Sequence, residues 1–128
     1  MPDSEKITIN MSAVDLGKID LLVQEGSYSN RTDFIRTAIR SQLDKHSFEI
    51  QQSVARNSYV IGVLTYDRSD LEKSLAKGEK MKITVIGLLH LQDDISPDLA
   101  ARAIESLQVR GVFLASDALK AALADRMS

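Results

Sequence analysis

The segment that most constrains the fold is residues 5–11, which have the sequence EKITINM. Apolar side chains occupy every second position and polar ones the positions between, a period of two that is typical of a β-strand. Helical patterns follow at once, so this part of the chain offers no second strand to satisfy the backbone groups. We therefore expect the strand to pair with its copy in a second chain, which predicts a homodimer.

Two amphipathic helices are predicted after this strand. Ser12 is a capping residue, and apolar side chains then recur at helical spacing, which predicts a helix over residues 13–25. Either Ser29 or Asn30 caps the next helix. The apolar positions of this second helix continue to about Arg56, so we expect one helix that extends that far.

The chain from residue 57 onward follows a different pattern, in which short apolar strands alternate with capped helices. The predicted strands cover the ranges 59–66, 80–91 and 112–115. The helices begin at capping residues, which are Ser69 (with Glu72), Ser96 and Ser116. The middle helix starts at Pro97, contains Ile104 and Leu107, and stops at Gly111. The predicted order is β-α-β-α-β-α, without an internal repeat.

These two patterns divide the chain into two predicted domains, residues 1–56 and residues 57–128, and give an α+β fold class. The first domain would contribute one strand to an intermolecular ribbon, followed by two helices per chain. The second would be a small β-α-β-α-β-α module. A piece of about 56 residues buries little core alone, so oligomerisation is expected for either half.

The composition restricts where a nucleic acid could bind. The net charge is −2, and residues 1–56 hold seven Lys/Arg against eight Asp/Glu, while residues 57–128 hold nine against ten. A broad basic surface, the usual sign of a nucleic-acid-binding domain, is therefore not expected, and any such surface must be a local patch.

The composition also indicates the cellular compartment of the protein. The chain has no cysteine, which excludes disulfides and thiolate metal sites. No apolar run reaches the roughly 18 residues that a membrane helix needs. The first residues, MPDSEK, lack the basic-then-apolar layout of a signal peptide. We therefore expect a cytoplasmic protein without a membrane partner.

The strand and the two helices resemble a ribbon-helix-helix DNA-binding domain, the fold of the CopG, Arc and MetJ repressors. The resemblance covers residues 5 to about 45 and rests on the segments KITINM and GSYSNRTDFIR. The second segment is similar to the Gly-Tyr-Asn-Asn-Arg-Ser segment of the nickel-responsive repressor branch. The resemblance implies that two chains pair their strands antiparallel and that this ribbon lies in the major groove of double-stranded DNA.

The resemblance implies that Lys6, Thr8 and Asn10 are the base-reading residues. Asparagine can bind adenine in a bidentate manner, lysine can donate to guanine acceptors, and threonine can serve either base. The three apolar side chains between and after them would point into the core shared by the two chains. The same alternation also occurs on the solvent face of an ordinary edge strand, which is the alternative interpretation.

The resemblance also implies a phosphate-binding site at the N-terminus of the second helix, formed by Ser29, Asn30, Arg31 and Thr32. Free backbone N–H groups and the helix dipole favour an anion there, and Arg31 adds a full positive charge. Such contacts fix the register of the protein on DNA without reading bases. Arg36 and Arg40, one turn apart, would either extend this contact or form an ordinary solvated face.

The one histidine and the aspartates of the second half do not predict a metal site. The nickel-responsive branch binds nickel through several histidines and a cysteine, whereas His90 has no second histidine nearby and the chain has no cysteine. His90 with Asp93 and Asp94 could bind a hard cation, but a turn and a helix cap explain the two aspartates equally well. No catalytic constellation is present, so we expect no metal, no cofactor and no enzymatic activity.

The resemblance therefore implies a transcriptional regulator, and more specifically a repressor, in which a dimeric ribbon contacts an operator. The second domain would assemble dimers into tetramers, or sense a ligand or partner. One alternative is an antitoxin that wraps a toxin with its C-terminal part and represses its own operon. Another is a ligand-binding or protein-interaction module in which the ribbon only dimerises.

Overall fold

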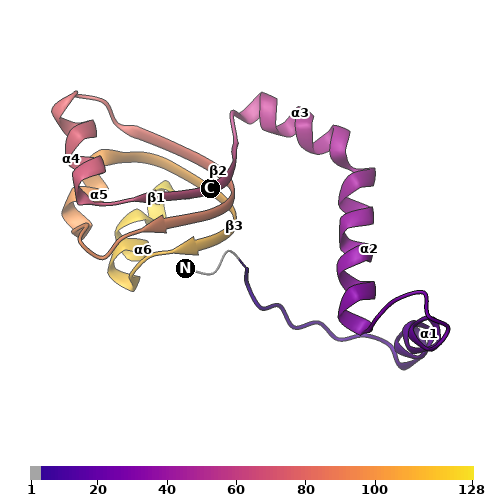
Figure 1. The fold of residues 1–128 in the computed structure, drawn as a ribbon. Helices are drawn as coiled ribbons and strands as arrows, with labels where there is room; N and C mark the ends of the chain where they lie inside the picture. Colours follow the sequence, from indigo (N-terminus) through magenta and orange to yellow (C-terminus); the bar gives the residue numbers. More distant parts are fainter. Residues whose placement is uncertain (1–3) are drawn as a thin grey trace. The chain divides into compact units, whose positions relative to one another are not determined.

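The computed structural model describes residues 4–128, so residues 1–3 of the predicted first domain lie outside the described part (Figure 1). Three helices come first: α1 (Ala13–Gln24), α2 (Arg31–Lys45) and α3 (Ser47–Asn57). Strands and helices then alternate: β1 (Val60–Tyr66), α4 (Arg68–Ala76), β2 (Met81–Leu91), α5 (Pro97–Ala103), β3 (Ile104–Leu114), α6 (Asp117–Leu123) and the 3-10 helix η1 (Ala124–Arg126). The predicted strand–helix order of the second half is confirmed. Within residues 4–128, no helix combines the length and apolar character needed to cross a bilayer.

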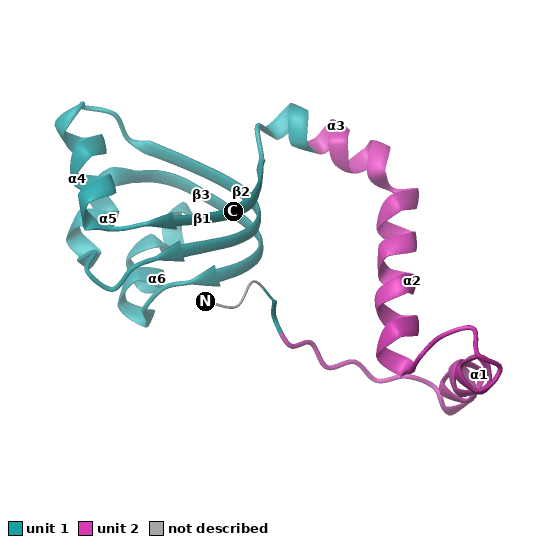
Figure 2. Cartoon of the chain, viewed as in Figure 1, with its two compact units in different colours: residues 1–5, 54–128 teal, residues 6–53 magenta. Residues whose placement is uncertain are grey.

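The described chain forms two compact units, which Figure 2 shows in different colours. Residues 6–53 carry α1, α2 and the first part of α3, and we call them the helical unit. Residues 4–5 and 54–128 form the other unit. Its residues 54–128 carry the strands and the remaining helices, and we call them the sheet module. The division between the two falls inside α3.

The sheet module is built on three parallel strands in the order β1-β2-β3. Parallel neighbours need crossover connections, which here are α4 and α5. Right-handed crossovers that proceed in one direction place both helices on the same face of the sheet. Side chains of α6 join the same core. This core includes Leu71, Val85, Leu89, Leu91, Ala100, Ile104, Leu107, Leu119 and Leu123.

The opposite face of the sheet is not part of this core. Side chains alternate between the two faces of a strand, and in β2 the odd-numbered residues other than Gly87, which are Ile83, Val85, Leu89 and Leu91, belong to the helix-covered cluster. The even-numbered residues therefore point to the other side. By strand register, this open face consists of Ile61, Val63, Thr65, Ile86, Leu88, His90, Arg110, Val112 and Leu114. Parallel sheets are usually covered on both faces, but the helices that contribute to the core all pack on the other face. On the open face Leu88 is buried, whereas Ile61 and Val63 are more than half exposed.

A row of three glycines crosses the sheet. Gly62, Gly87 and Gly111 pair with one another in register, with φ angles of 145°, 138° and 129°. A Cβ atom on Gly87 would lie 2.1 Å from the carbonyl oxygen of Gly62, and one on Gly111 would lie 2.1 Å from that of Gly87. Only glycine permits this approach. A valine two residues before each glycine is also aligned, so the strands share a Val-x-Gly repeat, and the prediction of no internal repeat was wrong.

The predicted long helix from Pro97 to Gly111 was also wrong. α5 ends at Ala103, and Ile104 already has an extended backbone, with φ −103° and ψ 115°. Ile104 and Leu107 are buried on β3, and the predicted strand at 112–115 is only the end of that longer strand. Residues along the whole of β3 pair with β2. This pairing between distant segments outweighs the local helical spacing.

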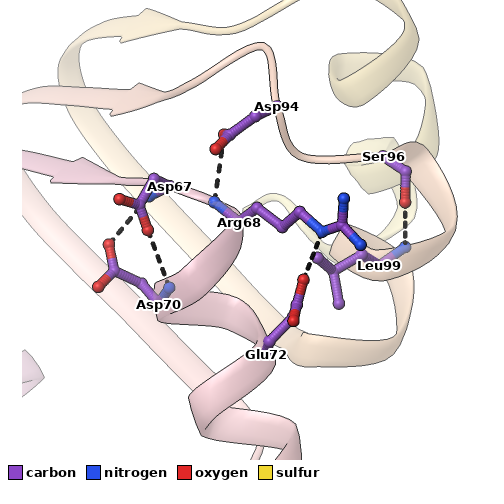
Figure 3. Close-up of polar contacts among 7 residues, drawn as sticks. All are labelled: Asp67, Arg68, Asp70, Glu72, Asp94, Ser96 and Leu99. Atoms are coloured by element: carbon purple, nitrogen blue, oxygen red, sulfur yellow. Dashed lines mark hydrogen bonds and ion pairs between the residues drawn. The ribbon is translucent and has the colours of Figure 1, made fainter.

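The cap of α4 lies two residues earlier than the predicted Ser69. The carboxylate of Asp67 accepts a hydrogen bond from the backbone N–H of Asp70, and the carboxylate of Asp70 accepts one from the N–H of Asp67, both at 2.9 Å (Figure 3). Glu72, predicted to complete the cap, instead pairs with Arg68 on the helix surface. The helix therefore begins almost directly after β1.

The second helix does not continue unbroken to Arg56. His46 has φ −102° and ψ 12°, which lie outside the helical region, and its N–H donates to the carbonyl of Leu43 at 3.1 Å. α3 begins at the next residue, and Nδ1 of His46 lies 3.1 Å from the carboxylate of Glu49. Apolar spacing on its own does not reveal a break of a single residue.

Candidate DNA interface

The helical unit has almost no core of its own. Ile19 is the one buried residue within the range 6–53. α2 presents an apolar groove of about 380 Å³, lined by Ala38, Ile39, Gln42, Leu43 and His46. A second groove of about 290 Å³ is lined by Met11, Asp15, Lys18, Ile19, Leu22 and Phe34. A unit of this size that leaves such side chains exposed is incomplete without a partner surface.

The predicted strand at residues 5–11 has no regular secondary structure in the single chain. Ile7 and Ile9 are 79% and 66% exposed, although burying each would be favourable by about 1.5–3 kcal/mol. Lys6, Thr8 and Asn10 are exposed as well. No strand in the described chain pairs with this segment, so its pairing between two chains stays a prediction.

Asn30 caps the N-terminus of α2. Its side-chain oxygen accepts a hydrogen bond from the N–H of Asp33 at 2.7 Å, and the carboxylate of Asp33 accepts one from the N–H of Ser29 at 2.9 Å. The N–H groups of Arg31 and Thr32 are the first two of the helix and meet no acceptor within residues 4–128. They are therefore available to an anion, although Asp33 places a negative charge nearby.

The guanidinium group of Arg31 is already paired. Its Nε and Nη2 atoms donate to the two carboxylate oxygens of Asp20 on α1, both at 2.8 Å. The hydrogen bond from Arg31 holds the pKa of Asp20 below its usual value of 3.8, and the same bond raises the pKa of Arg31. Because the pKa of Asp20 is lowered on folding, the contribution of this pair to stability is present above pH 3.8 and is lost as the pH falls through the lowered pKa. Asp20 therefore stays ionised at neutral pH.

Asp20 and Asp33 are the two residues near this site that sequence reasoning missed. Asp20 lies on another helix, eleven residues before Arg31, so no short spacing marks the pair. Asp33 did have a signal, because Asn30 and Asp33 show the three-residue spacing of a capping box. Arg36 and Arg40 are exposed farther along α2.

His90 and the aspartates after β2 are not gathered into one site. His90 lies on the open face, whereas the carboxylate of Asp94 accepts a hydrogen bond from the backbone N–H of Arg68 at 3.1 Å (Figure 3). In the part of the chain that the structure describes, no three His, Cys, Asp or Glu side chains are placed to hold a metal ion. The contact with Arg68 gives Asp94 a structural role at the start of α4.

Comparison with known proteins identifies the class of the molecule. The profile of the Ribbon-Helix-Helix transcriptional regulator family matches residues 2–120. The chain therefore belongs to this family, and the resemblance drawn from residues 5–45 is confirmed and now extends over most of the sheet module. Similarity to the nickel-responsive branch in particular is not confirmed. Neither the curated proteins nor the solved structures give a significant match.

Proposed function

We propose that the protein is a sequence-specific DNA-binding repressor that acts in the cytoplasm by placing a dimeric β-ribbon in the major groove of its operator. The observation that carries this proposal is the incomplete core of the helical unit, whose apolar side chains are exposed on residues 5–11 and along the groove of α2. A second copy of the same unit offers matching surfaces for both. Membership of a family of transcriptional regulators supports the same conclusion.

The alternation of residues 5–11 gives the ribbon two different faces. When the strand pairs with its copy, the apolar side chains turn toward the helices and the polar ones toward solvent. Lys6, Thr8 and Asn10 then lie on one surface, doubled by the two-fold axis, and contact base edges in the major groove. The phosphate contact comes from the N-terminus of α2, where Ser29, Asn30, Arg31 and Thr32 surround two free N–H groups.

Ile39→Asp is expected to convert the protein to monomers and to abolish DNA binding. Ile39 lines the groove of α2, and an ionised carboxylate cannot be buried there without a partner charge. Sedimentation gives the oligomeric state, and a gel shift with genomic fragments gives the binding. Ser41→Asp, at an exposed position of the same helix that does not line the groove, adds the same charge as a control.

Two results would contradict the proposal. One is an Ile39→Asp protein that stays dimeric and still shifts DNA. The other is a wild-type protein that binds all fragments weakly and without selection, as expected if the ribbon only dimerises.

We further propose that the sheet module joins two dimers through the open face, with a second copy of this chain as the occupant. The centre of this face is apolar and carries no acidic residue, so two copies can approach without repulsion between carboxylates. Ile61 and Val63 are 64% and 51% exposed there. The buried core on the other face supports a folded assembly module over an antitoxin tail that becomes ordered on a toxin.

Val63→Lys is therefore expected to reduce tetramers to dimers while the dimer still binds a single half-site. Lysine at this position would bury a charge against the apolar face of the partner. Light scattering measures the mass of the assembly, and Ser69→Lys, on the exposed surface of α4, is the charge-matched control. An unchanged mass for Val63→Lys would exclude the open face as the assembly surface.

A further inference from the structure

Asp20 occupies one of the two edges through which the guanidinium group of Arg31 can bind a phosphate, the edge formed by Nε and Nη2. Arginine binds carboxylates and phosphates through the same pair of parallel N–H groups. In this chain the Nε and Nη2 atoms both donate to Asp20 at 2.8 Å. A phosphate can take up this bidentate arrangement only if it displaces the carboxylate.

The charges around the N-terminus of α2 also favour competition between the Asp20 carboxylate and a phosphate for Arg31. Arg31 contributes one positive charge, whereas Asp20 and Asp33 contribute two negative charges within hydrogen-bonding contact of this helix end. With both carboxylates ionised, the site carries a net charge of −1, and the helix dipole and the two free N–H groups are its remaining attraction for an anion. The pair of Asp20 and Arg31 is about half exposed, so it is screened by water and can be displaced.

We propose that Asp20 weakens the binding of DNA by competing with a backbone phosphate for Arg31. This inference rests on the proposed DNA-binding function and adds a residue that acts through Arg31 without touching DNA. Phosphate contacts carry most sequence-independent affinity. Asp20 therefore lowers the affinity for every sequence and leaves discrimination to the base-reading residues of the ribbon.

The test compares the full-length wild type with Asp20→Asn on a DNA duplex of mixed sequence, over a series of KCl concentrations. Asp20→Asn restores one phosphate contact in each chain, so the slope of log affinity against log salt should steepen by about two per dimer. At low salt the affinity should rise roughly tenfold. Asp44→Asn removes the same charge from an exposed position on α2 outside this contact, and it should give a smaller gain with little change in slope.

A second variant separates the proposed competition from a general charge effect. In the double variant, Asp20→Asn is combined with Arg31→Ala. In the Arg31→Ala background, Asp20→Asn should no longer raise the affinity or steepen the salt slope, because there is no guanidinium group to release. A gain that survives Arg31→Ala, or an Asp20→Asn protein that binds no tighter than Asp44→Asn, would overturn the role of Asp20. If no variant binds any duplex even at low salt, the DNA-binding proposal itself fails, and the inference fails with it.

Discussion

Gly87→Ala is expected to unfold the sheet module under conditions in which the wild type is folded. Gly87 lies on the central strand, with φ 138° and with the carbonyl oxygen of Gly62 2.1 Å from the place of an added Cβ. The contact is with backbone, so no side-chain rotation relieves it. The strand would have to separate from β1 or move out of a glycine-only conformation, at a cost of roughly 3 kcal/mol or more.

Urea unfolding followed by circular dichroism, together with hydrogen exchange of the β2 amides, measures this loss. Gly17→Ala is the matched control, because Gly17 lies inside α1 and an added Cβ meets nothing within 4 Å. Alanine is favoured over glycine in a helix by about 1 kcal/mol, so the control should be slightly stabilising. A Gly87→Ala protein with wild-type protection of β2 would show that the close approach of the two strands is not needed for folding.

Asn10→Ala is expected to reduce the discrimination between operator and random DNA. The free-energy difference between the two binding events should fall by about 1–3 kcal/mol for each of the two contacts in a dimer. Asparagine donates to and accepts from a single adenine edge, and alanine can do neither. The operator is first selected from genomic fragments with the wild-type protein, and both affinities are then measured for each variant. Ser4→Ala changes an exposed polar residue just before the ribbon segment and should leave the ratio of the two affinities unchanged.

The ratio of the two affinities decides the role of Asn10. A phosphate-contacting or purely structural residue would lower specific and non-specific affinity equally. An equal loss in Asn10→Ala would therefore remove this residue from the base-reading set, although the protein could still bind DNA.

Features that depend on neighbouring residues were predictable from the sequence. Ser12, Ser96 and Ser116 each accept a hydrogen bond from a backbone N–H three residues later, as their positions predicted. The strand–helix order of the sheet module also followed from local patterns. These signals lie within one turn of a helix or one strand, so the sequence carries them directly.

Features that depend on contacts between distant residues were not predictable. The segment from Ile104 to Gly111 has helical spacing, and it forms a strand because β2 pairs with all of these residues except Glu105. The pair of Asp20 and Arg31 joins two helices, so no spacing rule marks it. The proposed base-reading and phosphate-binding roles rest on a family resemblance, because exposed polar residues on a predicted strand have no pattern that is unique to DNA contact.

The open face and the groove of α2 have a consequence for how much of this regulator a cell maintains. A newly made chain without a partner exposes both apolar surfaces, and such surfaces are bound by chaperones and lead to degradation. In the proposed dimer, paired chains cover the groove and are protected from degradation. Because pairing depends on the square of the chain concentration, the surviving amount should fall faster than the rate of synthesis when expression is low. If the protein acts as the proposed repressor, a small decrease in its transcription would then release the operator to a disproportionate extent.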